Sequence, residues 1–168
     1  MEPTWDAEHP AVLAAVSTLD PGQSLRVRGA VIRESAAVVL LADDRTRRAV
    51  ILTEASGVWT PPTMLCASTW DPADRPAETG APWALTQPAT SQSGTPGPGG
   101  APPRETWTAL SGLTATDAVS VLVRSELDEH EVAVPADGVI LALLRAPWGS
   151  RPAITVRTQH GDVPHLAP

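Results

Sequence analysis

Apolar and polar residues alternate over short stretches through most of this chain, a spacing that indicates β-strands. Between residues 25 and 32, Val27 and Val31 alternate with arginines, as expected for a strand with one buried face. Residues 36–42 and 49–52 are continuous apolar runs, which are typical of strands covered on both faces. Two shorter strands are expected around residues 58–59 and 64–67.

The last third of the chain predicts a series of antiparallel strands. Turn signals at Asp137-Gly138 and at His160-Gly161-Asp162 separate segments in which apolar and polar residues alternate. The expected strands cover residues 106–113, 119–124, 130–134, 139–145, 154–158 and 163–166. Short strands with turns at this spacing favour a sandwich or an open barrel.

Helical spacing is found in residues 10–19. Pro10 suits a first helical position, and Asp20-Pro21-Gly22 provides the stop. The expected apolar face consists of Val12, Leu13, Val16 and Leu19. The sequence therefore predicts an all-β fold, mainly antiparallel and either sandwich-like or an open barrel, with one short N-terminal helix.

The composition changes in the middle of the chain and divides it into three parts. Residues 1–85 are expected to hold the helix and the first strands, residues 86–104 a Pro/Gly-rich flexible linker or loop, and residues 105–168 the later antiparallel strands. The last part has about the size of a small immunoglobulin-like domain but lacks its paired cysteines. Because each strand-rich half is marginal in size for independent folding, we expect the two halves to share one core, although two modules remain an alternative.

Four residue types are missing from the chain: Phe, Tyr, Lys and Asn. All four use AT-rich codons, so their absence indicates a GC-rich genome. The lack of lysine excludes phosphate-binding P-loops and Schiff-base chemistry, and the lack of asparagine excludes N-glycosylation.

Charge and hydropathy indicate which partners and which cellular compartment to expect. The chain is acidic, with 12 Arg against 19 Asp and Glu and a net charge of −7, which disfavours nucleic acid as a partner. No signal peptide is expected at the acidic N-terminus, and the apolar runs fall short of the roughly 20 residues that a membrane helix needs. With Cys66 as the single cysteine, these features favour a cytoplasmic protein that does not bind membranes.

Reactive side chains form one notable cluster, at residues 126–131, where five acidic or histidine side chains lie close together in sequence. A divalent cation is one interpretation, but a solvated hairpin turn is favoured because the spacing of known calcium loops is missing. His160 and His165 lie near each other without a third ligand, and Cys66 is expected to be a small buried hydrophobe. We therefore predict no catalytic residue, no metal site and no cofactor.

Tryptophan and arginine supply the candidate binding residues. Several tryptophans lie beside prolines, and exposed indoles could contact a sugar or a partner protein, although packing in the core is the alternative. Of these, Trp70 and Trp83 are expected to be the most exposed. A basic cluster at Arg45, Arg47 and Arg48 could bind an anion unless Asp43 and Asp44 neutralise it. The candidate binding residues are Trp59, Trp70, Trp83, Trp148, Arg45, Arg47 and Arg48.

These observations predict a non-enzymatic, β-sandwich-like interaction or accessory protein that presents Trp-Pro loops to a protein partner. The first alternative is a small-ligand or carbohydrate-binding module that uses Trp59, Trp70 or Trp148. An enzyme with its pocket between the two halves is the second alternative, and it requires carboxylates or histidines that converge.

Overall fold

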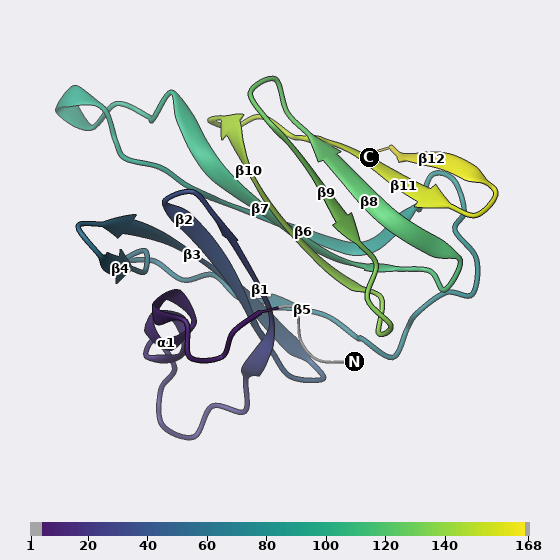
Figure 1. Ribbon diagram of the computed structural model, residues 1–168, viewed down its shortest axis with the longest axis horizontal. Coiled ribbons are helices and arrows are strands. Elements are labelled where there is room, and N and C mark those ends of the chain that lie inside the picture. Colours follow the sequence, from purple (N-terminus) through teal and green to yellow (C-terminus); the bar gives the residue numbers. More distant parts are fainter. Residues whose placement is uncertain (1–4, 167–168) are drawn as a thin grey trace. The chain divides into compact units, whose positions relative to one another are not determined.

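The computed structural model describes residues 5–166, and the chain divides between Asp71 and Pro72 into two compact units. The all-β prediction is confirmed: the described chain consists mainly of antiparallel strands, with one short α-helix near its start (Figure 1). Residues 1–4, which belong to the acidic N-terminus considered above, lie outside the described residues. No helix within residues 5–166 is long and apolar enough to cross a bilayer.

The N-terminal unit contains an antiparallel sheet with the strand order β1-β2-β3-β4, in which β5 also pairs with β3. Each central strand carries apolar residues in register with its neighbours: Val39 of β2 lies opposite Ala30 of β1 and Val50 of β3. All residues of β2 are buried, as its continuous apolar run predicted. The strands are β1 (Arg26–Arg33), β2 (Ala36–Ala42), β3 (Thr46–Ala55), β4 (Val58–Thr60) and β5 (Ser68–Thr69).

Helix α1 (Pro10–Val16) covers one face of this sheet. Val12 and Ala15 pack against Val39 and Leu52, and the imidazole of His9 caps the helix by accepting the backbone N–H of Ala11. The helix is shorter than the predicted 10–19, and a hydrogen-bonded turn follows it. Leu13 and Val16, which we placed on the buried face, are exposed, because the small residues Ala11 and Ala15 form that face instead.

The C-terminal unit is a β-sandwich (Figure 1). One sheet has the order β10-β7-β6 and the other has the order β12-β11-β8-β9. Leu110, Ile140 and Leu144 from the first sheet share a buried cluster with Val121, Val123 and Val156 from the second. The strands are β6 (Leu85–Ser93), β7 (Glu105–Thr114), β8 (Ala118–Arg124), β9 (Glu129–Ala133), β10 (Val139–Pro147), β11 (Ala153–Thr158) and β12 (Gly161–His165).

This strand order resembles that of immunoglobulin-like sandwiches. There, the first, second and fifth strands share one sheet, and the third, sixth and seventh share the other. Strands β6, β7 and β10 correspond to the first set, and β8, β11 and β12 correspond to the second. The fourth strand, β9, pairs with β8 instead of joining the first sheet. A fold topology of this kind does not by itself indicate a function.

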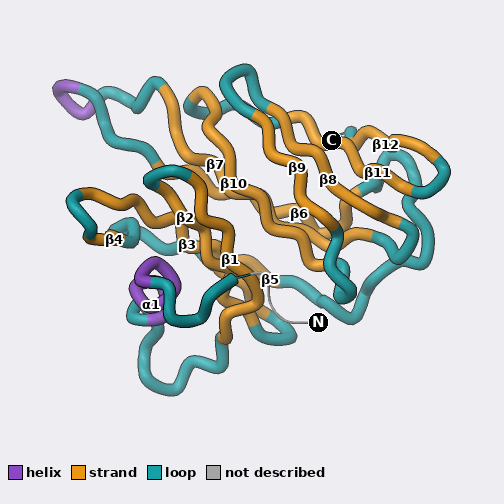
Figure 2. The backbone as a smooth tube through the Cα atoms, viewed as in Figure 1, coloured by secondary structure: helices purple, strands orange, loops and turns teal. Residues whose placement is uncertain are grey.

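The expected linker at residues 86–104 is partly wrong. Residues up to Ser93 form strand β6, which pairs with β7 along its whole length apart from a bulge between Thr86 and Ala89. Strand β6 was not predicted because its sequence consists largely of Thr, Gln and Ser and contains Pro88. An outer strand needs few apolar residues, so its composition resembles that of a loop. Residues 94–104 form an exposed hairpin loop with a short 3₁₀ turn, η1 (Pro98–Gly100), at its tip (Figure 2).

Candidate functional site

Trp148 lies on the turn between β10 and β11, with 49% of its surface exposed. The turn closes through a hydrogen bond from the N–H of Ser150 to the carbonyl of Pro147, at 3.1 Å. Gly149 has a φ of 73°, a left-handed conformation that glycine adopts without a steric penalty. The backbone of this turn is therefore defined by its own sequence.

Two further elements hold the Trp148 turn in place. The N–H of Trp148 donates to the carbonyl of Arg104 at 3.2 Å, which ties the turn to the end of the hairpin loop. The side chain of Gln92 on β6 bridges the turn: its Oε1 accepts the N–H of Gly149 at 3.2 Å, and its Nε2 donates to the carbonyl of Ser150 at 3.3 Å. Trp148 is thus an exposed aromatic residue on a backbone fixed from both sides.

The turn between β8 and β9 is tied to the same end of the sandwich. The hydroxyl of Ser125 donates to the carbonyl of Arg145, and the carboxylate of Asp128 accepts the N–H of Arg145 at 3.0 Å. Leu127 in this turn is 46% exposed. Because Arg145 lies three residues before Trp148, the end of β10 carries two neighbouring turns with exposed apolar side chains.

The other candidate tryptophans do not join Trp148. Trp83 is 57% exposed, as predicted, but it precedes β6, whereas Gln92 beside Trp148 lies near the end of β6, roughly 23 Å further along the strand. Trp59 is half-buried and packs edge to face against His9 in the N-terminal unit. The expectation that Trp70 is exposed was wrong, since only 6% of it is accessible.

Trp70 is buried because it closes the turn between β2 and β3. Its indole N–H donates to the carbonyl of Asp43 at 2.8 Å, and its backbone N–H donates to the carbonyl of Arg45 at 3.0 Å. The guanidinium of Arg47 lies over its ring, with 5.4 Å between the guanidinium carbon and the ring centre. These contacts indicate a structural role for Trp70.

The three candidate arginines do not form a single basic patch. Arg47 and Arg48 are consecutive residues of β3, so their side chains lie on opposite faces of the sheet. Arg47 is buried, and this burial lowers its pKa. Arg45 is exposed in the preceding turn, where Asp43 accepts its backbone N–H and that of Thr46.

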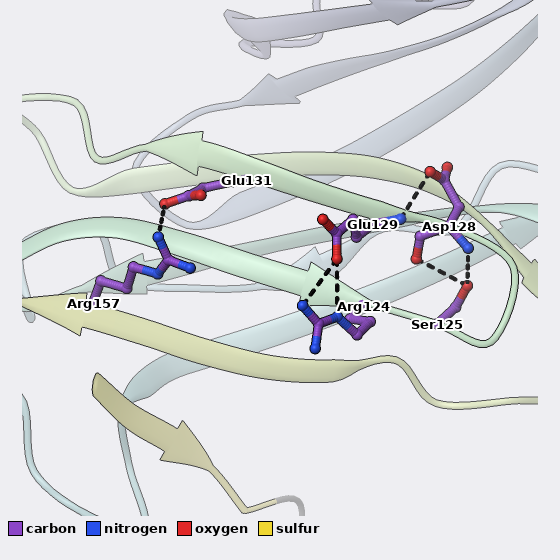
Figure 3. Close-up of polar contacts among 6 residues, drawn as sticks. All are labelled: Arg124, Ser125, Asp128, Glu129, Glu131 and Arg157. Atoms are coloured by element: carbon purple, nitrogen blue, oxygen red, sulfur yellow. Dashed lines mark hydrogen bonds and ion pairs between the residues drawn. The ribbon is translucent and has the colours of Figure 1, made fainter. Parts of the chain in front are cut away.

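The acidic cluster at residues 126–131 is spread over a hairpin, and three of its carboxylates, those of Asp128, Glu129 and Glu131, have separate partners (Figure 3). Glu129 pairs with Arg124 at 2.9 Å, and Glu131 pairs with Arg157 at 3.0 Å. Asp128 accepts backbone N–H groups from Glu129 and Arg145. Among residues 5–166, no group of three His, Cys, Asp or Glu side chains is placed to hold a metal ion.

The histidines serve mainly as acceptors for the backbone. The Nδ1 of His130 accepts the N–H of Leu143 at 3.1 Å, and the Nδ1 of His165 accepts the N–H of Leu85 at 3.3 Å. His160 lies in the exposed turn before β12. Cys66 is also exposed, contrary to expectation, because residues 64–67 form an irregular segment before β5 instead of the predicted strand.

A shallow polar groove of about 500 Å³ lies at the opposite end of the sandwich from Trp148. It is formed by residues 77–79, Asp117 and the β11–β12 turn around His160. One oxygen of Asp117 accepts both the N–H and the hydroxyl of Thr79, at 2.8 and 2.7 Å. None of the tryptophans described by the structure lines this groove, so stacking of an indole on a ligand there is not supported.

Comparisons with protein-family models, curated proteins and solved structures gave no match to this chain. The choice of the Trp148 turn as the candidate site therefore depends on its exposure and hydrogen bonds alone. Sequence reasoning selected Trp148 but missed Gln92, which fixes its turn. The only signal for Gln92 was a polar side chain in a stretch that we interpreted as a linker.

Proposed function

We propose that the chain is a non-enzymatic interaction protein that binds a protein partner through the turn carrying Trp148. The observation that carries this proposal is the exposed indole on a turn held by Gln92 and by the carbonyl of Arg104. Tryptophan provides a large contact area with few rotatable bonds, and it is enriched among the residues that dominate binding energies.

The fixed backbone of the Trp148 turn also supports the proposal. A partner that contacts a mobile loop must first restrict its motion, and that entropy opposes binding. Here the turn is already fixed by its closing hydrogen bond and by the bridge from Gln92, so a smaller loss of entropy accompanies binding. The neighbouring exposed Leu127 extends the apolar surface at the same end of the sandwich.

A non-enzymatic role is supported by how the histidines are used. In His9, His130 and His165, the Nδ1 atom accepts a backbone N–H group, so a neutral imidazole carries its proton on Nε2 and has no nitrogen lone pair left for a general base. The net charge of −7 supports a protein partner in place of nucleic acid, and we propose a cytoplasmic setting without membrane binding.

Affinity capture with three versions of the tagged full-length chain tests the proposal. The wild type, Trp148→Ala and Trp83→Ala are used to capture proteins from the source cells, and the bound proteins are quantified by mass spectrometry. Trp83 is the matched control because it is similarly exposed but lies at the other end of β6. A partner retained by Trp83→Ala and reduced about thirtyfold by Trp148→Ala supports the proposal.

The capture experiment also has clear contradicting outcomes. If Trp148→Ala retains the partner at the wild-type level, the binding surface lies elsewhere. If the wild type captures no partner specifically, the interaction role is wrong. A further variant, Gln92→Ala, leaves Trp148 in place but removes the bridge to its turn, so it is expected to weaken capture less than Trp148→Ala does.

The alternative is a carbohydrate-binding module in which Trp148 stacks on a sugar ring. A flat, exposed indole on a fixed turn suits this chemistry as well. Of the tryptophans considered for this role, Trp59 packs against His9 and Trp70 is buried, which leaves Trp148. Titration with a panel of glycans is expected to change the tryptophan emission of the wild type and not of Trp148→Ala. Unchanged wild-type spectra would remove this alternative.

A further inference from the structure

Strand β6 is an outer strand of the sheet β10-β7-β6, so one of its edges has no neighbouring strand. Residues 89–93 pair regularly with β7 on the other edge. Within the part of the chain that the structure describes, no hydrogen bond reaches the backbone of residues 89–93 from the side opposite β7. Backbone groups that face such an edge are able to pair with another strand.

The hydrogen bonds of β7 show which residues of β6 face the free edge. The N–H of Thr114, at the end of β7, donates to the carbonyl of Gly138 just before β10. Because successive residues of a strand direct their peptide groups to alternate sides, the even-numbered residues of β7 face β10 and the odd-numbered ones face β6. Leu85 agrees with this alternation: it lies opposite Thr114, and its N–H donates to His165, away from β7.

The same alternation applied to residues 89–93 identifies two free residues. Ala109 of β7 is odd-numbered and faces β6, where Ser91 lies opposite to it. Ser91 therefore bonds to β7, and its neighbours Thr90 and Gln92 direct their backbone N–H and C=O groups to the free edge.

The other outer strand of this sheet, β10, has its free edge occupied. The N–H of Leu143 donates to the Nδ1 of His130 at 3.1 Å, and the N–H of Arg145 donates to the carboxylate of Asp128 at 3.0 Å. Side chains from β9 and from the turn before it thus take the place of a neighbouring strand.

The remaining outer strands within residues 5–166 carry features that discourage pairing with another strand. β9 contains Glu129 and Glu131, and β12 contains Asp162 and Pro164. β1 contains three arginines and a bulge, and β4 and β5 have only three and two residues. In contrast, β6 has no charged residue, and its one proline, Pro88, precedes residues 89–93.

We propose that two copies of the chain form a dimer by antiparallel pairing of β6 with β6, about a twofold axis at Ser91. In this register, Thr90 of one copy lies opposite Gln92 of the other, and the two residues exchange both of their backbone hydrogen bonds. The axis repeats this pair, so two pairs with two bonds each join the copies. The three-stranded sheets become one continuous sheet with the order β10-β7-β6-β6-β7-β10.

A second copy suits this edge because self-pairing places no like charges opposite each other. The facing residues are Thr90 with Gln92, Ser91 with Ser91, and Ala89 with Ser93. Self-pairing of β9 would instead bring glutamates together, and self-pairing of β1 would bring arginines together. A twofold pair also uses both β6 edges, so assembly stops at the dimer.

The paired segment is short, so the dimer is expected to depend on concentration. Stable interfaces bury roughly 1,200 Å² or more, and pairing of five residues on each strand makes a smaller contact. Little entropy is lost, because β6 is already ordered by β7 and by the bridge from Gln92 to the Trp148 turn. We expect half of the chains to be paired at about 100 μM.

Sedimentation velocity of the full chain between about 5 and 500 μM tests the proposal. Thr90→Pro removes an N–H that faces the free edge and not β7, and proline is tolerated at such positions of outer strands. This variant is expected to raise the dissociation constant of the dimer at least tenfold. Thr90→Val keeps the N–H and is the matched control, with a dissociation constant within about twofold of the wild type. Thermal unfolding at low concentration checks that both variants fold.

Hydrogen exchange of the wild type decides the matter even if Thr90→Pro does not fold. Between about 5 and 500 μM, the amides of Thr90 and Gln92 are expected to exchange about threefold more slowly, as the paired fraction rises. The amide of Leu143, which is bonded within the chain, serves as the internal control and should not change.

Several results would overturn the proposal: a monomer at 500 μM, a dimer that Thr90→Pro leaves unchanged, or amides of Thr90 and Gln92 whose exchange does not depend on concentration. Species larger than a dimer would also overturn it, because they would indicate pairing between two different edges. No partner protein enters these measurements, so their outcome is independent of the function proposed for the Trp148 turn.

Discussion

The guanidinium of Arg47 lies over the indole of Trp70, with 5.4 Å between the guanidinium carbon and the ring centre. The two residues are 23 positions apart in the sequence, and the contact fixes the end of the N-terminal unit against β3. The indole N–H also donates to the carbonyl of Asp43. The Trp70 ring is therefore held by burial, by the guanidinium of Arg47 and by a hydrogen bond.

Replacing Trp70 is expected to destabilise the chain. Trp70→Ala removes a buried ring and should lower the free energy of unfolding by about 3 kcal/mol. Trp70→Phe keeps much of the ring contact but loses the bond to Asp43, so a loss of about 1 kcal/mol is expected. Urea denaturation measures both values. Equal effects of the two variants would show that the hydrogen bond, and not the packing, dominates.

Asp43 makes the stability of the chain depend on pH. The hydroxyl of Ser24, followed by the backbone N–H groups of Arg45 and Thr46, holds the pKa of its carboxyl below the ordinary value. A lowered folded-state pKa stabilises the fold above the ordinary pKa, near 4, and this contribution is lost as the pH falls through the folded-state pKa.

The variant Asp43→Asn is therefore expected to be less stable than the wild type at pH 7. Its disadvantage should shrink as the pH falls below the ordinary carboxyl pKa, near 4, and through the lowered folded-state pKa, because the wild-type carboxyl then becomes protonated as well. Urea denaturation at several pH values measures this convergence. Asp44→Asn, in the exposed neighbouring position, is the control and should show no such convergence.

Arg75 holds the segment before β6 against the sandwich. Its guanidinium donates to the carbonyls of Thr114, Ala115 and Ala136, which lie at the end of β7 and in the loop before β10. Arg75→Met keeps the aliphatic stem but leaves these carbonyls without the donor, and a loss of about 2 kcal/mol is expected in urea denaturation. Arg75→Lys cannot reproduce the planar geometry and should recover less than half of this loss.

Gly138 lies directly against the guanidinium of Arg75. Its φ of 76° lies in the left-handed region, and a Cβ atom there would overlap the guanidinium of Arg75. Gly138→Ala is expected to destabilise the wild type more than it destabilises Arg75→Met, where the obstruction is smaller. Equal effects in both backgrounds would assign the loss to the positive φ and to the contact of the Cβ with the carbonyl of Thr114, at 2.9 Å, and not to Arg75.

The sequence prediction that the two strand-rich halves share one core can be tested by calorimetry. A shared core predicts a single transition at neutral pH in which the calorimetric and van't Hoff enthalpies agree. Two separate transitions, or a ratio of these enthalpies well above one, would favour two independent modules.

Much of the fold could be predicted from local patterns. The apolar run of β2 and the alternation in β8 identified these strands because each signal lies within a single segment. Strand β6 was missed because an outer strand with a bulge and a proline has the composition of a loop. The topology that pairs β10 with β7 depends on long-range packing, which local spacing does not encode.

The site was predicted less well for a similar reason. Trp83 was correctly expected to be exposed. Trp70, which lies beside a proline in a similar context and was also expected to be exposed, is buried, whereas the candidate Trp148 is exposed. What distinguishes Trp70 is its bond to Asp43, which lies 27 residues away in the chain. The hydrogen bonds of His130 and His165 also cross between strands, so nothing near either histidine in the sequence indicated them.

The hairpin loop between β6 and β7 has a practical consequence for engineering. Its residues 94–104 are mostly exposed, and the N–H of Gly97 donates to the carbonyl of Ala101, so the tip closes on itself. A foreign peptide or a fluorescent reporter inserted at η1 would leave the strand pairing of β6 and β7 intact. Since the loop ends at Arg104, whose carbonyl holds the Trp148 turn, such a reporter would sit beside the surface whose occupancy it is meant to sense.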